Sequence, residues 1–86
     1  MRTCYICGTT RNIETHHVFY GPFRAKADKY GYVVDLCHNC HNEPPNGVHF
    51  NKDLDRGFKK MFQKKAMKEN RWSKEDFIRE FGRNYL

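Results

Sequence analysis

The sequence predicts a small α+β domain that is held together by a zinc ion, here called zinc-stapled. Its 86 residues are 38% hydrophobic, and a core of that size is marginal without a covalent or metal cross-link. Two Cys-x-x-Cys pairs, at 4–7 and 37–40, supply a candidate cross-link. Residues 1–50 contain short strand-like runs, whereas residues 51–86 have helical periodicity, with no low-complexity linker between them. We therefore expect one domain over 1–86, with the sites in the first part and a basic helical second part.

The four cysteines have the spacing of a zinc site. Two intervening residues let both thiolates of a pair bind one tetrahedral ion, at about 2.3 Å. The opening residues lack the apolar stretch of a secretory signal, so we expect a reducing cytoplasm, where paired cysteines bind metal more often than they form structural disulfides. Two local disulfides or a redox Cys-x-x-Cys are the alternatives. The predicted ligands of one structural Zn²⁺ are Cys4, Cys7, Cys37 and Cys40.

Two strand-like runs lie between the cysteine pairs. The runs "ETHHVF" and "YVVDL" predict a β-hairpin, and the stretch "YGPFRAKADKYG" between them, with turn residues at both ends, predicts a loop. Adjacent strand residues point to opposite faces. His16 and His17 are therefore expected to face opposite sides of the hairpin.

A long helix is predicted in the second part. Apolar residues recur there at helical spacing, with lysines mostly on the other face. Asn46 or Asn51 can cap its start. We expect this apolar stripe to pack in the core, and its members are Leu54, Phe58, Met61, Phe62 and Ala66.

A second, shorter helix is predicted near the C-terminus. Ser73 followed by Asp76 three residues later resembles a capping box, and Gly82 marks the expected end. Apolar residues such as Phe77 and Phe81 give this helix a face that can fold back on the first part of the chain.

The charge of the chain favours a polyanionic partner. The formal net charge is +6 and the isoelectric point is near 9.3, which suits nucleic acid and phosphate contacts. No segment approaches the length of a membrane span, so no membrane partner is expected. The alternative is an ordinary solvated basic surface. The candidate DNA contacts are Arg24, Lys26, Lys52, Arg56, Lys59 and Lys60.

The order of these motifs resembles the HNH endonucleases. A Cys-x-x-Cys pair, a strand bearing His-His, the run "LCHNCH" and a later histidine before a helix follow that family's pattern over residues 4 to about 60. The runs "GVHFNK" and "FGRNYL" are similar to small phage-encoded members. The resemblance implies a treble-clef-like ββα-metal core, made of a zinc knuckle, a β-hairpin and a helix, with the short C-terminal helix added to it.

The resemblance also implies roles for the histidines. His16 and His41 would bind a catalytic divalent ion, such as Mg²⁺, Mn²⁺, Ni²⁺ or Zn²⁺, and His17 would be the general base. We expect His49 to be a third ligand, because a catalytic metal site needs about three protein ligands and an open position. Histidine suits base catalysis because its ordinary pKa is about 6.5. The family's asparagine, which usually orients the base, falls at Tyr32.

The predicted activity is metal-dependent hydrolysis of DNA phosphodiesters, with nicking of duplex or branched DNA. The expected setting is the cytoplasm of a bacterial host cell, with a phage gene as one origin, and the protein would act as a homodimer or within a larger phage DNA-processing complex. A catalytically degenerate DNA-binding protein or nuclease-recruiting module is the alternative, favoured by Tyr32. A zinc-stabilised protein-interaction module is a third hypothesis.

Overall fold

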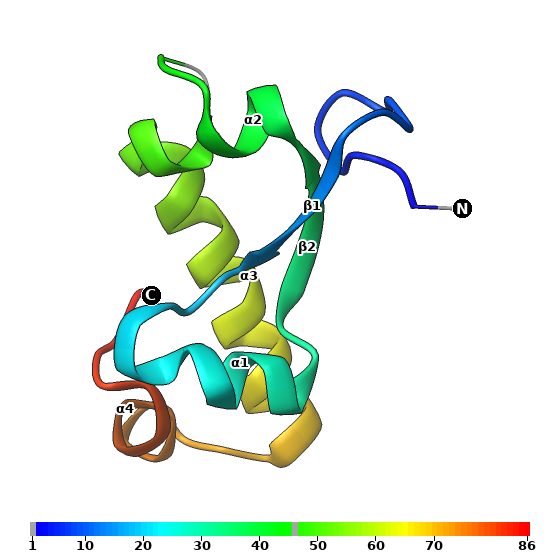
Figure 1. Ribbon diagram of the computed structural model, residues 1–86. Helices are drawn as coiled ribbons and strands as arrows, with labels where there is room; N and C mark the ends of the chain where they lie inside the picture. The colour runs from blue at the N-terminus through cyan, green and yellow to red at the C-terminus, as the bar shows by residue number, and fades with distance from the viewer. Residues whose placement is uncertain (1, 46) are drawn as a thin grey trace.

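The computed structural model describes residues 2–45 and 47–86. Its sheet consists of two antiparallel strands, β1 (Ile13–His17) and β2 (Val33–Cys37). The register pairs Glu14 with Leu36 and His16 with Val34. The predicted hairpin strands are thus present, and Figure 1 shows them beside the long helix α3.

The segment that joins the two strands is not the predicted loop. It contains a 3₁₀ turn, η1 (Gly21–Phe23), and a helix, α1 (Arg24–Tyr30), seen in Figure 1 below the strands. Two features explain the error. The helical residues include two alanines and three basic residues, which favour helix, and Gly31, with φ of 78°, closes the helix instead of forming a hairpin turn.

The first helical segments after the sheet are α2 (His38–Asn42), η2 (Val48–Phe50) and α3 (Lys52–Asn70). The side chain of Asn51 accepts a hydrogen bond from the backbone N–H of Leu54 at 3.1 Å, which confirms Asn51 as the N-cap of α3. Asn46, the other candidate cap, lies outside the described residues.

The buried face of α3 differs in part from the predicted stripe. Phe58, Phe62 and Ala66 are buried as expected. Met61, however, is 39% exposed, and Gln63 is fully buried. The prediction of buried residues is therefore confirmed for Phe58, Phe62 and Ala66 and wrong for Met61.

The last helix, α4 (Lys74–Phe81), begins and ends as predicted. Both hydrogen bonds of the capping box are present between Ser73 and Asp76, and Gly82 closes the helix with φ of 86°. Phe77 and Phe81 are buried by 99% or more.

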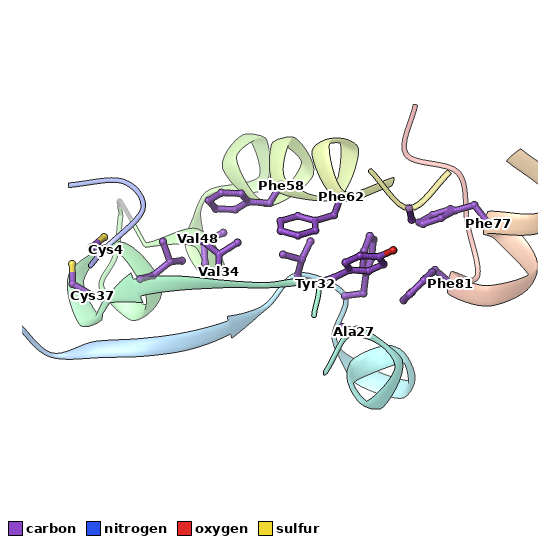
Figure 2. Close-up of a cluster of buried hydrophobic side chains, with 14 residues drawn as sticks. Cys4, Ala27, Tyr32, Val34, Cys37, Val48, Phe58, Phe62, Phe77 and Phe81 are labelled. Carbon is purple, nitrogen blue, oxygen red and sulfur yellow. The ribbon is translucent and has the colours of Figure 1, made fainter. Parts of the chain in front are cut away.

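One hydrophobic cluster draws on both parts of the chain. Figure 2 shows Cys4 and Cys37 at one end of it and Phe77 and Phe81 of α4 at the other. Tyr32 lies between these ends and is 1% exposed. The cysteine group therefore closes one end of a core whose other end is aromatic.

Among the helices that the structure describes, none is both long enough and apolar enough to cross a lipid bilayer.

Candidate metal centres and a neighbouring basic cavity

The four cysteines form one group. Their sulfur atoms all lie within 4.8 Å of one another, an arrangement that could hold a metal ion. The sulfurs of Cys7 and Cys37, which belong to different pairs, are 3.6 Å apart, close to the roughly 3.8 Å separation of thiolates bound at 2.3 Å to a tetrahedral zinc. This geometry disfavours two local disulfides, because it brings the pairs together instead of closing each one separately.

The thiol of Cys4 is more acidic than an ordinary cysteine thiol. Burial would raise its pKa, but hydrogen bonds from the backbone of Cys7, Cys37 and Ile6 outweigh burial and lower the pKa of Cys4 to about 6. Burial and the neighbouring thiols raise the pKa of Cys40. Neutral pH thus favours a first thiolate at Cys4, and a bound cation would favour ionisation of the remaining thiols.

A second group consists of His16, His41 and His49, one ligand nitrogen of each lying within 4.8 Å of the others. The Nε2 atoms of His41 and His49 are 3.0 Å apart. The ring centroid of His16 lies 5.1 Å from that of His41 and 5.2 Å from that of His49. Strand β1, helix α2 and turn η2 therefore each contribute one imidazole.

His16 has an unusual environment for a polar side chain. It is 1% exposed, and its Nε2 has no hydrogen-bond partner among the described residues. Leaving such an atom unpaired costs about 1–3 kcal/mol. Burial, aided by charge on His41 and His49, lowers the pKa of His16 to about 4. At neutral pH, His16 is therefore an uncharged imidazole whose buried nitrogen lacks a partner, which fits a cation ligand.

Glu14 sets the tautomer of His41. A carboxylate only accepts hydrogen bonds, and its Oε1 lies 2.8 Å from Nδ1 of His41. Nδ1 of His41 therefore carries the proton and donates a hydrogen bond to Glu14. Nε2 of His41 then keeps its lone pair and lies 3.0 Å from Nε2 of His49. Carboxylate–histidine pairs of this kind orient metal ligands.

Glu14 also contacts the segment that carries Cys37 and Cys40. Its Oε2 lies 3.0 Å from Nδ1 of His38, and its Oε1 accepts a hydrogen bond from Asn42 at 2.9 Å. His38 contacts Glu43 at 2.8 Å through its other nitrogen. His38 is exposed, and its hydrogen bonds to Glu14 and Glu43 raise its pKa. It lies between Cys37 and Cys40 in the sequence and belongs to neither of the two groups that could hold a metal ion.

His17 borders the same cavity as the histidine group. This cavity, of about 190 Å³, is lined by His16, His17, His41, His49, Thr15, Tyr20 and Arg24. His17 is half-buried, unlike His16, and its Nε2 lies 3.4 Å from Oδ1 of Asp28. One cavity therefore holds a possible ion-binding group and a further imidazole beside it.

Tyr32, at the position where the resemblance to HNH endonucleases would place an asparagine, does not line this cavity. Its ring stacks on Tyr30 with centroids 5.5 Å apart, and its hydroxyl accepts a hydrogen bond from Asn70 at 3.4 Å. Burial raises its pKa. The residue is a core element, so it cannot orient His17.

The predicted DNA contacts occupy different places. Arg24 lines the histidine cavity. Lys52, Arg56 and Lys59 line a neighbouring cavity of about 370 Å³, although Lys59 is 7% exposed and forms an ion pair at 2.6 Å with Asp55.

Two other predicted contacts lie outside both cavities. Lys60 is exposed on α3 and lines neither of them. Lys26 binds Glu80 through the carboxylate at 3.0 Å and through the backbone carbonyl at 3.1 Å, so it joins α1 to α4.

Several residues near these cavities were not predicted from the sequence, among them Glu14, Tyr20, Arg83 and Tyr85. Glu14 orients His41, and the other three line the larger basic cavity. The position of Glu14, two residues before His16 on a strand, was a usable signal, because alternate strand residues share a face.

Comparisons of the chain with protein-family models, with curated proteins and with solved structures give no match. Any statement about function therefore depends on the geometry of the two residue groups and the cavities beside them.

Proposed function

We propose that the protein is a metal-dependent DNA endonuclease of the HNH type. The observation that carries this proposal is the buried, unpartnered Nε2 of His16 beside the Nε2 atoms of His41 and His49. Buried polar atoms are seldom left unpaired, and three converging imidazoles suit a divalent cation. The knuckle, the hairpin and the helical segment after it would then form a treble-clef-like ββα-metal core.

The residues of the cavity have separate tasks in this proposal. His16, His41 and His49 hold the divalent ion, and Glu14 keeps His41 in the tautomer that exposes Nε2. When bound, the ion supplies a Lewis acid that stabilises negative charge on phosphate oxygens. His17 takes the proton from the attacking water, since it lies in the same cavity but outside the ligand group.

The four cysteines have a structural task. We assign them one Zn²⁺, because a closed set of four thiolates leaves no open position for a substrate. The ion would join the N-terminal knuckle to the point where β2 leads into α2. Such a cross-link compensates for the small core of the chain.

A second candidate function is DNA binding without cleavage. The observation that favours it is the burial of Tyr32 in the core, because the side chain that would usually orient the base is missing from the cavity. A module of this kind would keep both ion sites for folding or for recruiting another nuclease.

Nicking of supercoiled plasmid tests the proposal. Purified protein is incubated with the plasmid and Mg²⁺, Mn²⁺, Ni²⁺ or Zn²⁺, alongside the variants His16→Ala and His17→Ala. We expect His17→Ala to lower the nicking rate by roughly 10²-fold or more, the usual contribution of a positioned general base, with no loss of ion affinity. His16→Ala should weaken ion binding instead.

The concentration of the divalent ion separates the two defects. A higher concentration should partly restore His16→Ala, because weak binding is overcome by mass action, and should leave His17→Ala unchanged. The reverse pattern would exchange the two roles. Equal nicking by the wild type and both variants would reject this cavity as an active site, and DNA binding without nicking under any ion would favour the second function.

A further inference from the structure

The larger basic cavity is built by elements far apart in the sequence. Its volume is about 370 Å³, within the range of about 300–1,000 Å³ that is usual for small-molecule sites. Its walls come from the start of α3, from the C-terminal tail (82–86) and from the residue that precedes η1. The lining residues are Tyr20, Lys52, Asp55, Arg56, Lys59, Arg83 and Tyr85.

A buried glutamine holds the C-terminal tail against α3. The side-chain amide of Gln63 is fully buried and donates a hydrogen bond to Oδ1 of Asn84 at 2.8 Å. Its carbonyl oxygen accepts a hydrogen bond from the backbone N–H of Tyr85 at 2.7 Å. The tail is therefore fixed on the helix, with Arg83 and Tyr85 at the cavity.

The side chains that line the cavity carry more positive than negative charge. Lys59 neutralises Asp55 through their 2.6 Å ion pair, and Asp55 also accepts a hydrogen bond from the hydroxyl of Tyr20 at 3.2 Å. Among the described residues, Lys52, Arg56 and Arg83 form no salt bridge with an acidic side chain. The cavity thus presents three unpaired cations, which favours an anion.

Two tyrosine rings form the apolar part of the wall. The Nζ of Lys59 lies 4.0 Å from the ring centroid of Tyr20, and the guanidinium of Arg83 lies 5.2 Å from that of Tyr85. Tyr20 is 43% exposed. Cations alternating with aromatic rings are what a nucleotide needs, because its phosphate is anionic and its base can stack.

The basic cavity adjoins the histidine cavity. Tyr20 lines both, and its ring centroid lies 5.8 Å from that of His49 and 6.3 Å from that of His16. A strand with one phosphate at the histidines can therefore reach the basic cavity with a neighbouring nucleotide.

We propose that this cavity binds an unpaired nucleotide next to the phosphodiester at the histidines, with Arg83 contacting its phosphate and Tyr20 and Tyr85 contacting its base or sugar. The inference depends on the proposed function for its polynucleotide partner. A duplex backbone crossing the surface would offer phosphates but no free base to fill the space between the rings. The site therefore favours a single-stranded or branched substrate.

Fluorescence anisotropy with labelled single-stranded and duplex oligonucleotides tests this site. The zinc-loaded protein is titrated without added divalent ion, so that binding is measured apart from cleavage. We expect Arg83→Gln to lower single-strand affinity by about 10-fold at low salt and to reduce the salt slope by about 0.7, the contribution of one phosphate on a single strand. Arg83→Lys should retain most of the affinity.

Arg71→Gln is the matched control, because Arg71 is an exposed arginine at the other end of α3. It removes the same charge and should leave affinity and salt slope unchanged. Tyr85→Leu should weaken single-strand binding by about 5-fold or more through lost stacking, with little effect on duplex binding. Thermal unfolding of each variant checks that the tail still packs.

Two results would overturn the inference. Equal effects of Arg83→Gln and Arg71→Gln would mean that the cavity contributes only general charge. Equal loss of single-strand and duplex binding in Tyr85→Leu would show that no unpaired base is bound. Binding that depends on Arg83 in a protein that never nicks DNA would instead reject the endonuclease function and leave the nucleotide site standing.

Discussion

The contact between Glu14 and His41 gives a quantitative prediction for divalent-ion affinity. Replacing Glu14 with glutamine keeps the size of the side chain but changes the 2.8 Å hydrogen bond to Nδ1 of His41 from charge-assisted to neutral. Such bonds contribute about 1.5–3 kcal/mol with a charged partner and about 0.5–1.5 kcal/mol without one. The difference, roughly 1–1.5 kcal/mol, corresponds to up to about 10-fold in affinity, because about 1.4 kcal/mol is one decade.

Solvent limits the size of this effect. The side chain of Glu14 is 36% exposed, so water screens part of the charge interaction, and we take 10-fold as the upper figure. Glu14→Ala removes the hydrogen bond entirely and should approach the roughly 100-fold limit seen for residues that orient metal ligands. Isothermal titration of the zinc-loaded protein with Ni²⁺ or Mn²⁺ measures both losses.

Glu43→Gln is the matched control for this measurement. Glu43 binds His38 at 2.8 Å, as Glu14 does on the other side of that ring. Among the described residues, however, the hydrogen-bond contacts of His41 are with Glu14, Asn42 and His49 and not with Glu43. Its replacement should leave ion affinity unchanged. Equal affinities for the wild type and Glu14→Gln, or equal losses for Glu14→Gln and Glu43→Gln, would refute the assignment of Glu14 as the residue that orients His41.

Two further predictions concern the stability of the fold. Elemental analysis should find about one tightly held zinc per chain. Cys7→Ser or prolonged chelation should remove the zinc and unfold the domain, because metal binding and folding are linked. A protein that stays folded with two disulfides and no zinc would exclude the site. Ser73→Ala should lower the free energy of unfolding by about 1 kcal/mol through loss of the α4 N-cap, measured by urea denaturation, whereas an unchanged unfolding midpoint would mean that α4 does not depend on its capping box.

Much of the fold could be predicted because its signals are local. The Cys-x-x-Cys pairs, the cap at Asn51 and the capping box at Ser73 each occupy a few consecutive residues. Helix α1 was missed because its seven residues are too few for a periodic pattern, and because a glycine that ends a helix looks the same in sequence as one in a hairpin turn.

The candidate sites were predictable only where residue type alone suggests chemistry. Histidine and cysteine are common metal ligands, so these residue types alone suggest a site. Glu14 has its role because it contacts His41, 27 residues away in the sequence. Arg83 has its role because it lines a cavity. Gln63 is the clearest example. The position of Gln63 in the sequence of α3 does not predict a contact with the C-terminal tail. Its buried amide nevertheless holds that tail through hydrogen bonds with Asn84 and Tyr85.

Tyr32 and Asp28 together show how the surroundings of His17 differ from the HNH pattern that the sequence resembles. Strand β2 starts immediately after Tyr32, whose side chain is committed to the aromatic core, so that position has no polar group to offer His17. Helix α1, which lies where a loop was predicted, brings Oδ1 of Asp28 to 3.4 Å from Nε2 of His17. A carboxylate accepts hydrogen bonds and donates none. This contact therefore favours the tautomer of His17 in which Nε2 carries the proton and donates to Asp28, and in which Nδ1 keeps the lone pair. Any orientation of His17 by a side chain therefore depends on α1 and not on the strand.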